Sequence, residues 1–126
     1  DGVKRLADDH LAWITNERKI APATVEAYRL ASRDGWLMFP YLADGELLAA
    51  KYRKLPKQFR QDADCTPCLF GWQAIAPDAR SVIVCEGELD AMAWHTYGFP
   101  ALSVPMGGGG GGEQGWIATE FDRLAL

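Results

Sequence analysis

The sequence has 126 residues, which is enough for one domain or for one and a half small ones. Hydrophobic residues make up 48% and charged residues 24%, as is normal for a folded soluble protein. The formal charge of −4 gives no global sign of nucleic-acid binding. No stretch is long and apolar enough to span a bilayer, no signal peptide opens the chain, and the three cysteines give no obvious disulfide framework, so we expect a protein of a reducing cytoplasm.

Two helices are predicted at the start of the chain. Apolar residues recur at helical spacing over residues 3–16, which predicts an amphipathic helix. A second helix is expected to begin near Pro22, because proline suits a first helical turn, and its apolar stripe continues as far as Ala31. Asp34 and Gly35 are expected to end this element.

A β-hairpin is predicted next. Two strands, over residues 36–42 and 46–53, flank a turn at residues 43–45 that contains Asp and Gly. Because side chains alternate along a strand, Lys51 and Arg53 are expected on the same face of the second strand. The hairpin therefore presents two cations side by side.

The back half of the chain has the pattern of a parallel unit. After an irregular stretch over residues 54–80, residues 81–85 predict a fully buried strand, and a short helix follows that Gly98 is expected to cap. A second strand is predicted over residues 101–104 and a second helix over residues 116–124. The inner stripe of the first of these helices is expected to comprise Leu89, Met92, Ala93 and Tyr97.

Together these elements predict an α/β protein in two parts. Residues 1–80 would form a small α+β subdomain of helices and a β-hairpin, and residues 81–126 the first β-α-β-α part of a Rossmann-like parallel sheet. The chain begins at Asp1 without a methionine and stops just after a helical pattern, so we expect a fragment of a longer protein. Ligands of parallel sheets gather at the carboxyl ends of the strands, where Glu86 and the glycine run lie.

Three carboxylates, Glu86, Glu88 and Asp90, follow the predicted buried strand on alternate positions around Gly87, which allows a tight strand-to-helix turn. Glu88, and in part Asp90, suit a helix N-terminus, where an acid contributes about 0.3–1 kcal/mol. Glu86 precedes the helix, at an edge where carboxylates hold Mg²⁺ by one or two oxygens and leave the other positions to water and phosphates. We therefore expect a bound Mg²⁺ or Mn²⁺ at Glu86, while Asp90 fits both a capping acid and a second metal ligand.

Five cations and no acid lie between Lys51 and Arg60. Protection of an edge strand against aggregation is a sufficient explanation for Lys54. It explains Lys51 and Arg53 less well, because these two share a face and continue into Lys57 and Arg60 without an intervening acid. We interpret these four residues as a nucleotide- or DNA-binding group that attracts phosphates with a marked salt dependence.

Two further motifs give weaker signals. Cys65 and Cys68 have half of a zinc-knuckle spacing, but no second pair of Cys or His accompanies them, so we expect no zinc; Cys85 is expected in the core. The glycines from Gly107 to Gly112 lack the Lys-Ser/Thr pair of a phosphate-binding loop. Both a flexible linker and a backbone nest for an anion fit this run.

The sequence "VIVCEGELDAMA", followed by "GFPALSVPMGGG", resembles the start of a TOPRIM domain, the metal-dependent module of primases, topoisomerases and some nucleases. Upstream, "WITNERKIAPATVEAYRL", "LMFPYLADGELLAAKYR" and "CLFGWQAI" are similar to the subdomain that precedes TOPRIM in DNA primases of the phage primase–helicase and Twinkle type. The resemblance covers most of the chain and is strongest over residues 36–57 and 69–107.

The resemblance implies roles for individual residues. Glu86 matches the TOPRIM glutamate, for which the family implies general acid/base or metal-linked chemistry, and Asp90 matches the aspartate four positions later. The match thus implies that Glu86 and Asp90 hold the metal. Gly107 matches a glycine that follows the second strand, and Gly87 and Gly107 are expected to take part in nucleotide or DNA binding. The basic positions that face the nucleoside triphosphate or the template in phage primases correspond to Lys51, Arg53 and Lys57.

The family completes its metal site with an Asp-x-Asp motif on the next strand, and its template-reading zinc module lies upstream, so we expect this fragment alone to be inactive. The expected parent is a phage or prophage primase–helicase of the bacterial cytoplasm, without a membrane partner. It would make RNA primers on single-stranded DNA from ribonucleoside triphosphates by Mg²⁺-dependent nucleotidyl transfer, with a helicase domain downstream. The alternatives are a TOPRIM nuclease or topoisomerase, a non-catalytic DNA-binding TOPRIM scaffold, and a generic α/β domain whose acids only cap a helix.

Overall fold

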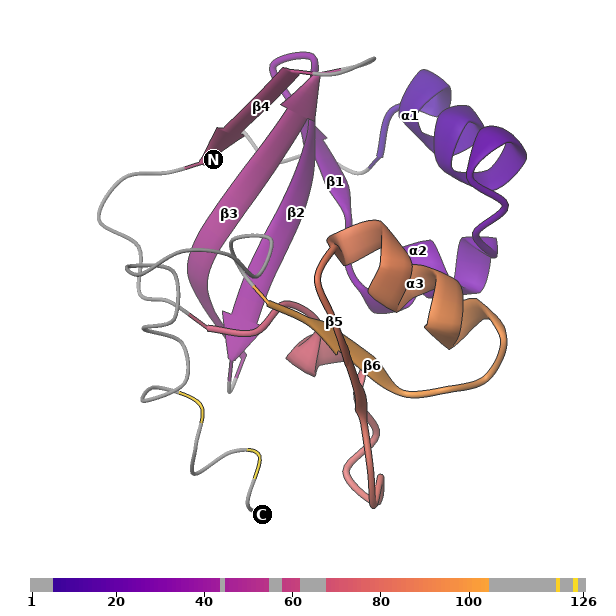
Figure 1. Cartoon of the computed structure of the whole chain (residues 1–126). Helices are drawn as coiled ribbons and strands as arrows, with labels where there is room; N and C mark the ends of the chain where they lie inside the picture. The colour runs from indigo at the N-terminus through magenta and orange to yellow at the C-terminus, as the bar shows by residue number, and fades with distance from the viewer. Residues whose placement is uncertain are drawn as a thin grey trace.

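The structure is a computed structural model that describes residues 6–43, 45–54, 58–61 and 68–104, together with Glu120 and Leu124. For 58–61 only the backbone is described. Within these residues an antiparallel sheet and a smaller parallel sheet are combined with helices (Figure 1). The predicted α/β class, with a hairpin sheet in front and a parallel strand pair behind, is confirmed.

The N-terminal helices are shorter than the sequence predicts. α1 (Asp8–Ala12) continues into a π-helical turn, η1 (Trp13–Glu17), and α2 (Pro22–Ala27) begins at the predicted proline. The expected continuation of the second helix to Ala31 is wrong. Arg29 adopts a positive φ of 59°, which ends the helical path, and Ala31 pairs with Met38 in a strand instead.

The four-stranded antiparallel sheet has the order β1-β2-β3-β4. Its strands are β1 (Ala31–Arg33), β2 (Trp36–Ala43), β3 (Glu46–Lys54) and β4 (Gln58–Gln61). The predicted hairpin of β2 and β3 is confirmed, with Gly45 at a positive φ of 79° in the turn. β4 falls in the stretch expected to be irregular, because Gln-Phe-Arg-Gln has no apolar alternation that would predict a strand.

The second sheet pairs β5 (Ile83–Cys85) with β6 (Ala101–Ser103) in parallel, and α3 (Glu88–Thr96) connects the two strands. Gly98, at a positive φ of 96°, ends the helix as predicted. The expectation of a fully buried first strand is wrong, because Val84 is 45% exposed on a face that the described residues leave open. Tyr97, expected in the inner stripe, is 78% exposed; the predicted second helix lies outside the described residues except for Glu120 and Leu124.

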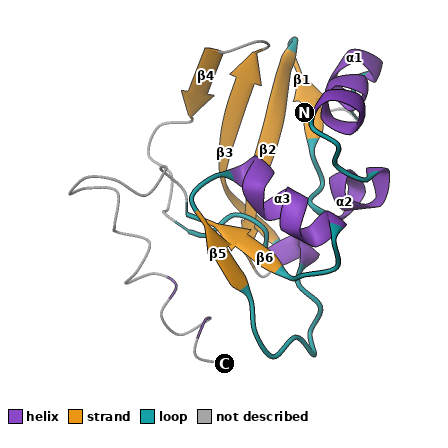
Figure 2. Ribbon diagram, turned by 45° about the vertical axis from the view of Figure 1, so that its right-hand side comes forward, coloured by secondary structure: helices purple, strands orange, loops and turns teal. Residues whose placement is uncertain are grey.

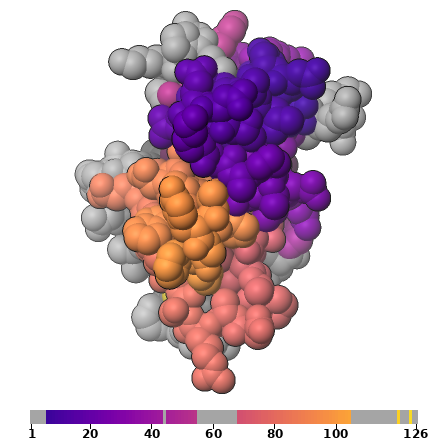
Figure 3. Space-filling view, turned by 90° about the vertical axis from the view of Figure 1, so that its right-hand side faces the viewer, coloured from indigo at the N-terminus to yellow at the C-terminus, as the bar shows by residue number. Residues whose placement is uncertain are grey.

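One core joins the two predicted parts. Buried residues of the N-terminal helices and of β2 pack together with Leu89 and Met92 of α3. Tyr28 crosses between the parts, since its hydroxyl donates a hydrogen bond of 2.6 Å to the carbonyl of Ala101. α2 and α3 lie side by side next to the larger sheet (Figure 2), and the space-filling view shows the N-terminal helices against α3 on one face (Figure 3).

Candidate functional site

A cleft of about 200 Å³ lies where β3 meets the N-terminal end of α3. It brings together residues from three parts of the chain: the segment after η1, the strands β2 and β3, and the start of α3. The lining residues are Arg18, Phe39, Lys51, Tyr52, Arg53, Gly87, Glu88, Leu89 and Asp90. Two larger hollows, of about 580 and 540 Å³, each have a single charged residue in their lining, Arg80 in the first and Asp90 in the second, so neither brings several cations together.

The register of the hairpin explains why two cations reach this cleft. Lys51 lies opposite Phe39 and Arg53 lies opposite Leu37, so both cations share the sheet face that packs against the helices. Tyr52, between them, points to the other face and is buried there. The predicted alternation is therefore correct. The edge-protection alternative is wrong for β3, which lies between β2 and β4.

Lys51 is bound directly to the acidic segment. Its Nζ lies 2.8 Å from Oε2 of Glu88, and the two side chains are only 23% and 17% exposed. The hydroxyl of Tyr41 donates a hydrogen bond to the same oxygen, and the Tyr41 ring lies below the ammonium at 5.9 Å. Burial, and then the charge of Glu88, raise the pKa of Tyr41 far above its usual value, so its hydroxyl keeps its proton.

The helix-capping role predicted for Glu88 is therefore incomplete. Glu88 lies in the first turn of α3, where its charge suits the helix dipole, but no side-chain hydrogen bond caps this helix. Its carboxylate instead faces the sheet and joins β2, β3 and α3 through two side chains. The sequence did contain a signal for this contact, since Tyr41 and Lys51 fall on the same predicted face of the hairpin.

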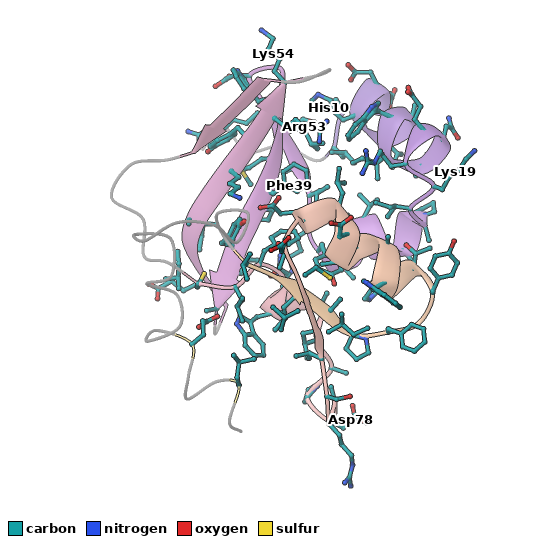
Figure 4. All side chains as sticks on the ribbon, viewed as in Figure 1. His10, Lys19, Phe39, Arg53, Lys54 and Asp78 are labelled. Carbon is teal, nitrogen blue, oxygen red and sulfur yellow. The ribbon has the colours of Figure 1, made fainter. Side chains whose placement is uncertain are left out.

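Arg18 is a cleft residue that no sequence pattern indicates. The guanidinium groups of Arg18 and Arg53 lie 5.7 and 4.7 Å from the ring centroid of Trp13. Burial, followed by the like charge of Arg18, lowers the pKa of Arg53, while Glu88 opposes this shift. Two guanidinium groups on one indole form a cationic wall that an anion would stabilise. Figure 4 shows Arg53 between the sheet and α1.

Glu86 and Asp90 stay at the positions predicted for metal ligands. Both side chains are exposed; Glu86 follows β5 at the carboxyl end of the parallel pair and does not line the cleft, whereas Asp90 does. A Cβ placed on Gly87 would lie 3.2 Å from a carboxylate oxygen of Asp90, so the glycine allows a close approach between the turn and this acid. The two acids thus lie on either side of Gly87, a turn residue that has no side chain.

Two carboxylates near the start of α3, those of Glu86 and Asp90, are available as ligands for Mg²⁺. Among the residues that the structure describes, no three acids, histidines or cysteines are close enough to form a metal cage. Mg²⁺ commonly takes one or two carboxylates and fills its remaining positions with water and substrate phosphates. Glu86 and Asp90 fit this type of site, whereas the carboxylate of Glu88 is already engaged by Lys51 and Tyr41.

Several predicted residues cannot be placed. Lys57, Cys65 and Gly107, with the rest of the glycine run, lie outside the described residues, and the side chain of Arg60 does so as well, although its backbone pairs with Tyr52. Of the other cysteines, Cys68 is buried and Cys85 is partly buried at the end of β5. Burial, and then the charge of Asp90, raise the pKa of the Cys85 thiol, which disfavours a reactive thiolate.

The chain has relatives among known proteins. No family model matches the chain. Two proteins of Arabidopsis thaliana, each aligned over 95 residues and 71% of this chain, are similar in sequence: a primase homolog protein at 34% identity and a chloroplastic/mitochondrial Twinkle homolog protein at 35%. The chain spans 28% of the first relative and 13% of the second.

The fold also matches solved structures. The primase fragment of the bacteriophage T7 primase–helicase matches with a TM-score of 0.62 and 22% identity, over 86% of this chain and 47% of the fragment. T7 primase domains bound to an RNA/DNA hybrid and dTTP, in a structure with the lagging-strand DNA polymerase, match with the same TM-score and identity over 73% of this chain and 45% of theirs. At this level of identity the likeness concerns the fold.

The antiparallel sheet and the parallel strand pair are the fold that this chain shares with the T7 primase fragment. The named sequence relatives and the shared fold make the chain more particularly a domain of the primase and Twinkle type, which confirms the resemblance seen in the sequence. In the part of the chain that the structure describes, every helix is too short or too polar to cross a membrane.

Proposed function

We propose that this chain is part of a primase or primase–helicase whose intact form makes RNA primers on single-stranded DNA by Mg²⁺-dependent nucleotidyl transfer. One observation carries the proposal beyond the family relationship. Lys51 and Arg53 of β3, Arg18 of the N-terminal segment and the start of α3 line one small cleft, although they are far apart in the sequence. A polyphosphate needs such converging cations, and a generic α/β domain with a capped helix does not.

The transfer joins the 3′-hydroxyl oxygen of one nucleotide to the α-phosphorus of the next, the bond to the departing pyrophosphate breaks, and the hydroxyl proton is released to water. Arg18, Lys51 and Arg53 would bind the triphosphate oxygens and orient the phosphorus for in-line attack, so their contribution is positioning and charge stabilisation. Glu86 and Asp90 would hold Mg²⁺, which when bound neutralises phosphate charge and supports the attack.

Further partners would bind outside the cleft. Lys57 and Arg60, which follow β3, would contact the template or the triphosphate. The template would be single-stranded DNA, and a helicase domain would lie elsewhere in the parent chain. A phage or prophage origin and a bacterial cytoplasmic location are part of the same proposal, and the nuclease, topoisomerase and non-catalytic readings are its competitors.

The test is primer synthesis by the intact parent protein, measured with labelled ribonucleotides on single-stranded DNA. Lys51→Ala and Arg53→Ala should each lower primer yield strongly. Lys54→Ala is the matched control, because Lys54 lies on the same strand, faces Trp36 on the other side of the sheet, and does not line the cleft. Nicked DNA without primers would instead support the nuclease or topoisomerase reading. Equal effects of all three substitutions would contradict the assigned role of the cleft.

A further inference from the structure

The cleft contains one feature that phosphate binding alone does not explain, namely the ion pair between its central lysine and an acid. Arg18, Lys51 and Arg53 supply three positive charges, and Glu88 and Asp90 supply two negative charges. If Lys51 acted only as a free cation, Glu88 would weaken its attraction for a phosphate. The ion pair therefore needs a different reason.

A contribution to folding stability does not explain this ion pair. Ion pairs near a surface contribute little to folding, because desolvation and lost side-chain entropy offset the attraction between the charges. Here Tyr41, which is 1% exposed, adds its hydroxyl to the same oxygen of Glu88. Such an arrangement fixes the direction of the carboxylate, and with it the place of the lysine ammonium.

The geometry leaves Lys51 able to bind a ligand. An ammonium has three N–H donors. Among the described residues, Lys51 uses its charge on one carboxylate oxygen of Glu88 and on the face of Tyr41. Two donors remain for phosphate oxygens that enter the cleft. The long, flexible side chain is thus held at both its strand and its tip before a ligand arrives.

We infer that Glu88 and Tyr41 are positioning residues, an inference that rests on the proposed function. They hold Lys51 in the orientation in which it binds the triphosphate of the incoming nucleotide. Glu88 fixes the ammonium, and Tyr41 fixes Glu88. Neither residue touches the reacting atoms. Their effect is to lower the entropy that Lys51 would otherwise lose when the nucleotide binds.

The experiment compares Glu88→Gln and Tyr41→Phe in the intact parent protein. Positioning predicts that each substitution lowers kcat/KM for nucleotide incorporation by about tenfold, the effect of one charge-assisted hydrogen bond. The kcat/KM of the double variant should be no lower than that of the less active single variant, because both substitutions act through Lys51. A purely electrostatic role of Glu88 predicts the opposite sign: Glu88→Gln would lower KM with kcat unchanged, and Tyr41→Phe would behave like the unaltered protein.

Either of those two electrostatic results would overturn the inference. Thermal unfolding of each variant separates a folding defect from a loss of positioning; if Glu88→Gln does not fold, Tyr41→Phe, which removes only one oxygen, decides alone. Binding of ATP with Mg²⁺ is measured by calorimetry beside primer synthesis. If the unaltered protein makes primers and the variants have the same kcat/KM and the same affinity for ATP, the inference fails and the proposed function stands. If it binds ATP without making primers, the proposed function fails, and a tenfold weaker binding by both variants still supports the inference.

Discussion

The hydroxyl of Tyr28 lies 2.6 Å from the carbonyl oxygen of Ala101, and this hydrogen bond joins the end of α2 to the first residue of β6. Tyr28 also stacks on Phe70, with ring centroids 5.3 Å apart, and Phe70 exchanges two backbone hydrogen bonds with Ser103 of β6. The helices before the antiparallel sheet are therefore fixed to the parallel unit, whose helix α3 contributes Glu88 and Asp90 to the cleft.

Tyr28→Phe should test this link. Tyr28 is fully buried, so removing its hydroxyl leaves the Ala101 carbonyl without this donor and should lower the free energy of unfolding by about 1–3 kcal/mol. Urea unfolding of the folded chain measures the change. Tyr97→Phe is the control, since Tyr97 is 78% exposed and should change stability by less than about 0.5 kcal/mol. Equal effects of the two substitutions would show that the Tyr28 hydroxyl stabilises nothing.

Gly71→Ala should lower the free energy of unfolding more than the same change at another glycine of positive φ. A Cβ at Gly71 would lie 2.8 Å from the ring of Tyr28 and 3.1 Å from the Ala101 oxygen, and the backbone φ is 117°. We expect a loss of roughly 2–4 kcal/mol in urea unfolding, because strain and overpacking add. At Gly35, with φ 81° and nothing within 4 Å, Ala should cost only about 1 kcal/mol. Similar losses at both glycines would mean that the close approach of Tyr28 is unimportant.

Arg18→Gln should weaken nucleotide binding by the parent protein. The substitution removes one of three cations of the cleft, and we expect the Kd for ATP to rise by about tenfold at low salt and by less at high salt, because salt screens the lost attraction. Calorimetry at two ionic strengths measures both effects. Lys19→Gln is the matched control: this exposed neighbour does not line the cleft and lies at the end of the helical segment (Figure 4). A rise in Kd for both variants would indicate a general charge effect instead of a site.

The sequence predicted much of this site, because alternation along a strand is a local property. Lys51 and Arg53 were expected on one face, and Asp90 at the start of a helix beyond a parallel strand, and the structure brings these three residues to one cleft. The partners of these residues were not predicted. Strand alternation does place Tyr41 on the face of Lys51. Arg18 reaches the cleft, and Glu88 reaches Tyr41 and Lys51, only because separate elements pack together, and helical or strand spacing does not predict that packing.

Packing between separate elements also explains where the fold differs from the sequence-based predictions. Val84 and Tyr97 are apolar or aromatic at positions where local pattern predicts burial, yet burial depends on which layers cover a surface. Gln58–Gln61 form a strand because β3 offers its free edge as a pairing partner, while their own sequence has no strand pattern. Local periodicity thus identifies elements with a strong apolar face and misses elements that depend on a neighbour.

Glu86→Gln and Asp90→Asn should each raise the Mg²⁺ concentration needed for half-maximal primer synthesis by the parent protein, by about tenfold or more. The reason is that each change removes one of the two exposed carboxylates at the start of α3 that the metal is proposed to use. A Mg²⁺ titration at constant ATP measures this. Glu46→Gln, which changes an exposed acid at the start of β3, is the control and should leave the titration unchanged. A lower maximal rate with an unchanged Mg²⁺ dependence would argue against a metal role for these acids.

The stability of the domain should also depend on the protonation of His95. Burial lowers the pKa of this imidazole, whose Nδ1 lies 2.8 Å from the Thr24 hydroxyl and whose ring meets the edge of Tyr28. The folded state therefore favours neutral His95, while the unfolded chain binds a proton near the ordinary pKa of about 6.5. It follows that the contribution of His95 to stability is complete above that pH and is lost as the pH falls through it towards the lower folded pKa. Urea unfolding between about pH 5 and pH 8 should show this fall, and His95→Gln, which carries no titrating group, should reduce it relative to the unaltered chain. An identical pH dependence in both proteins would assign the acid sensitivity to the carboxylates instead, since these titrate in both.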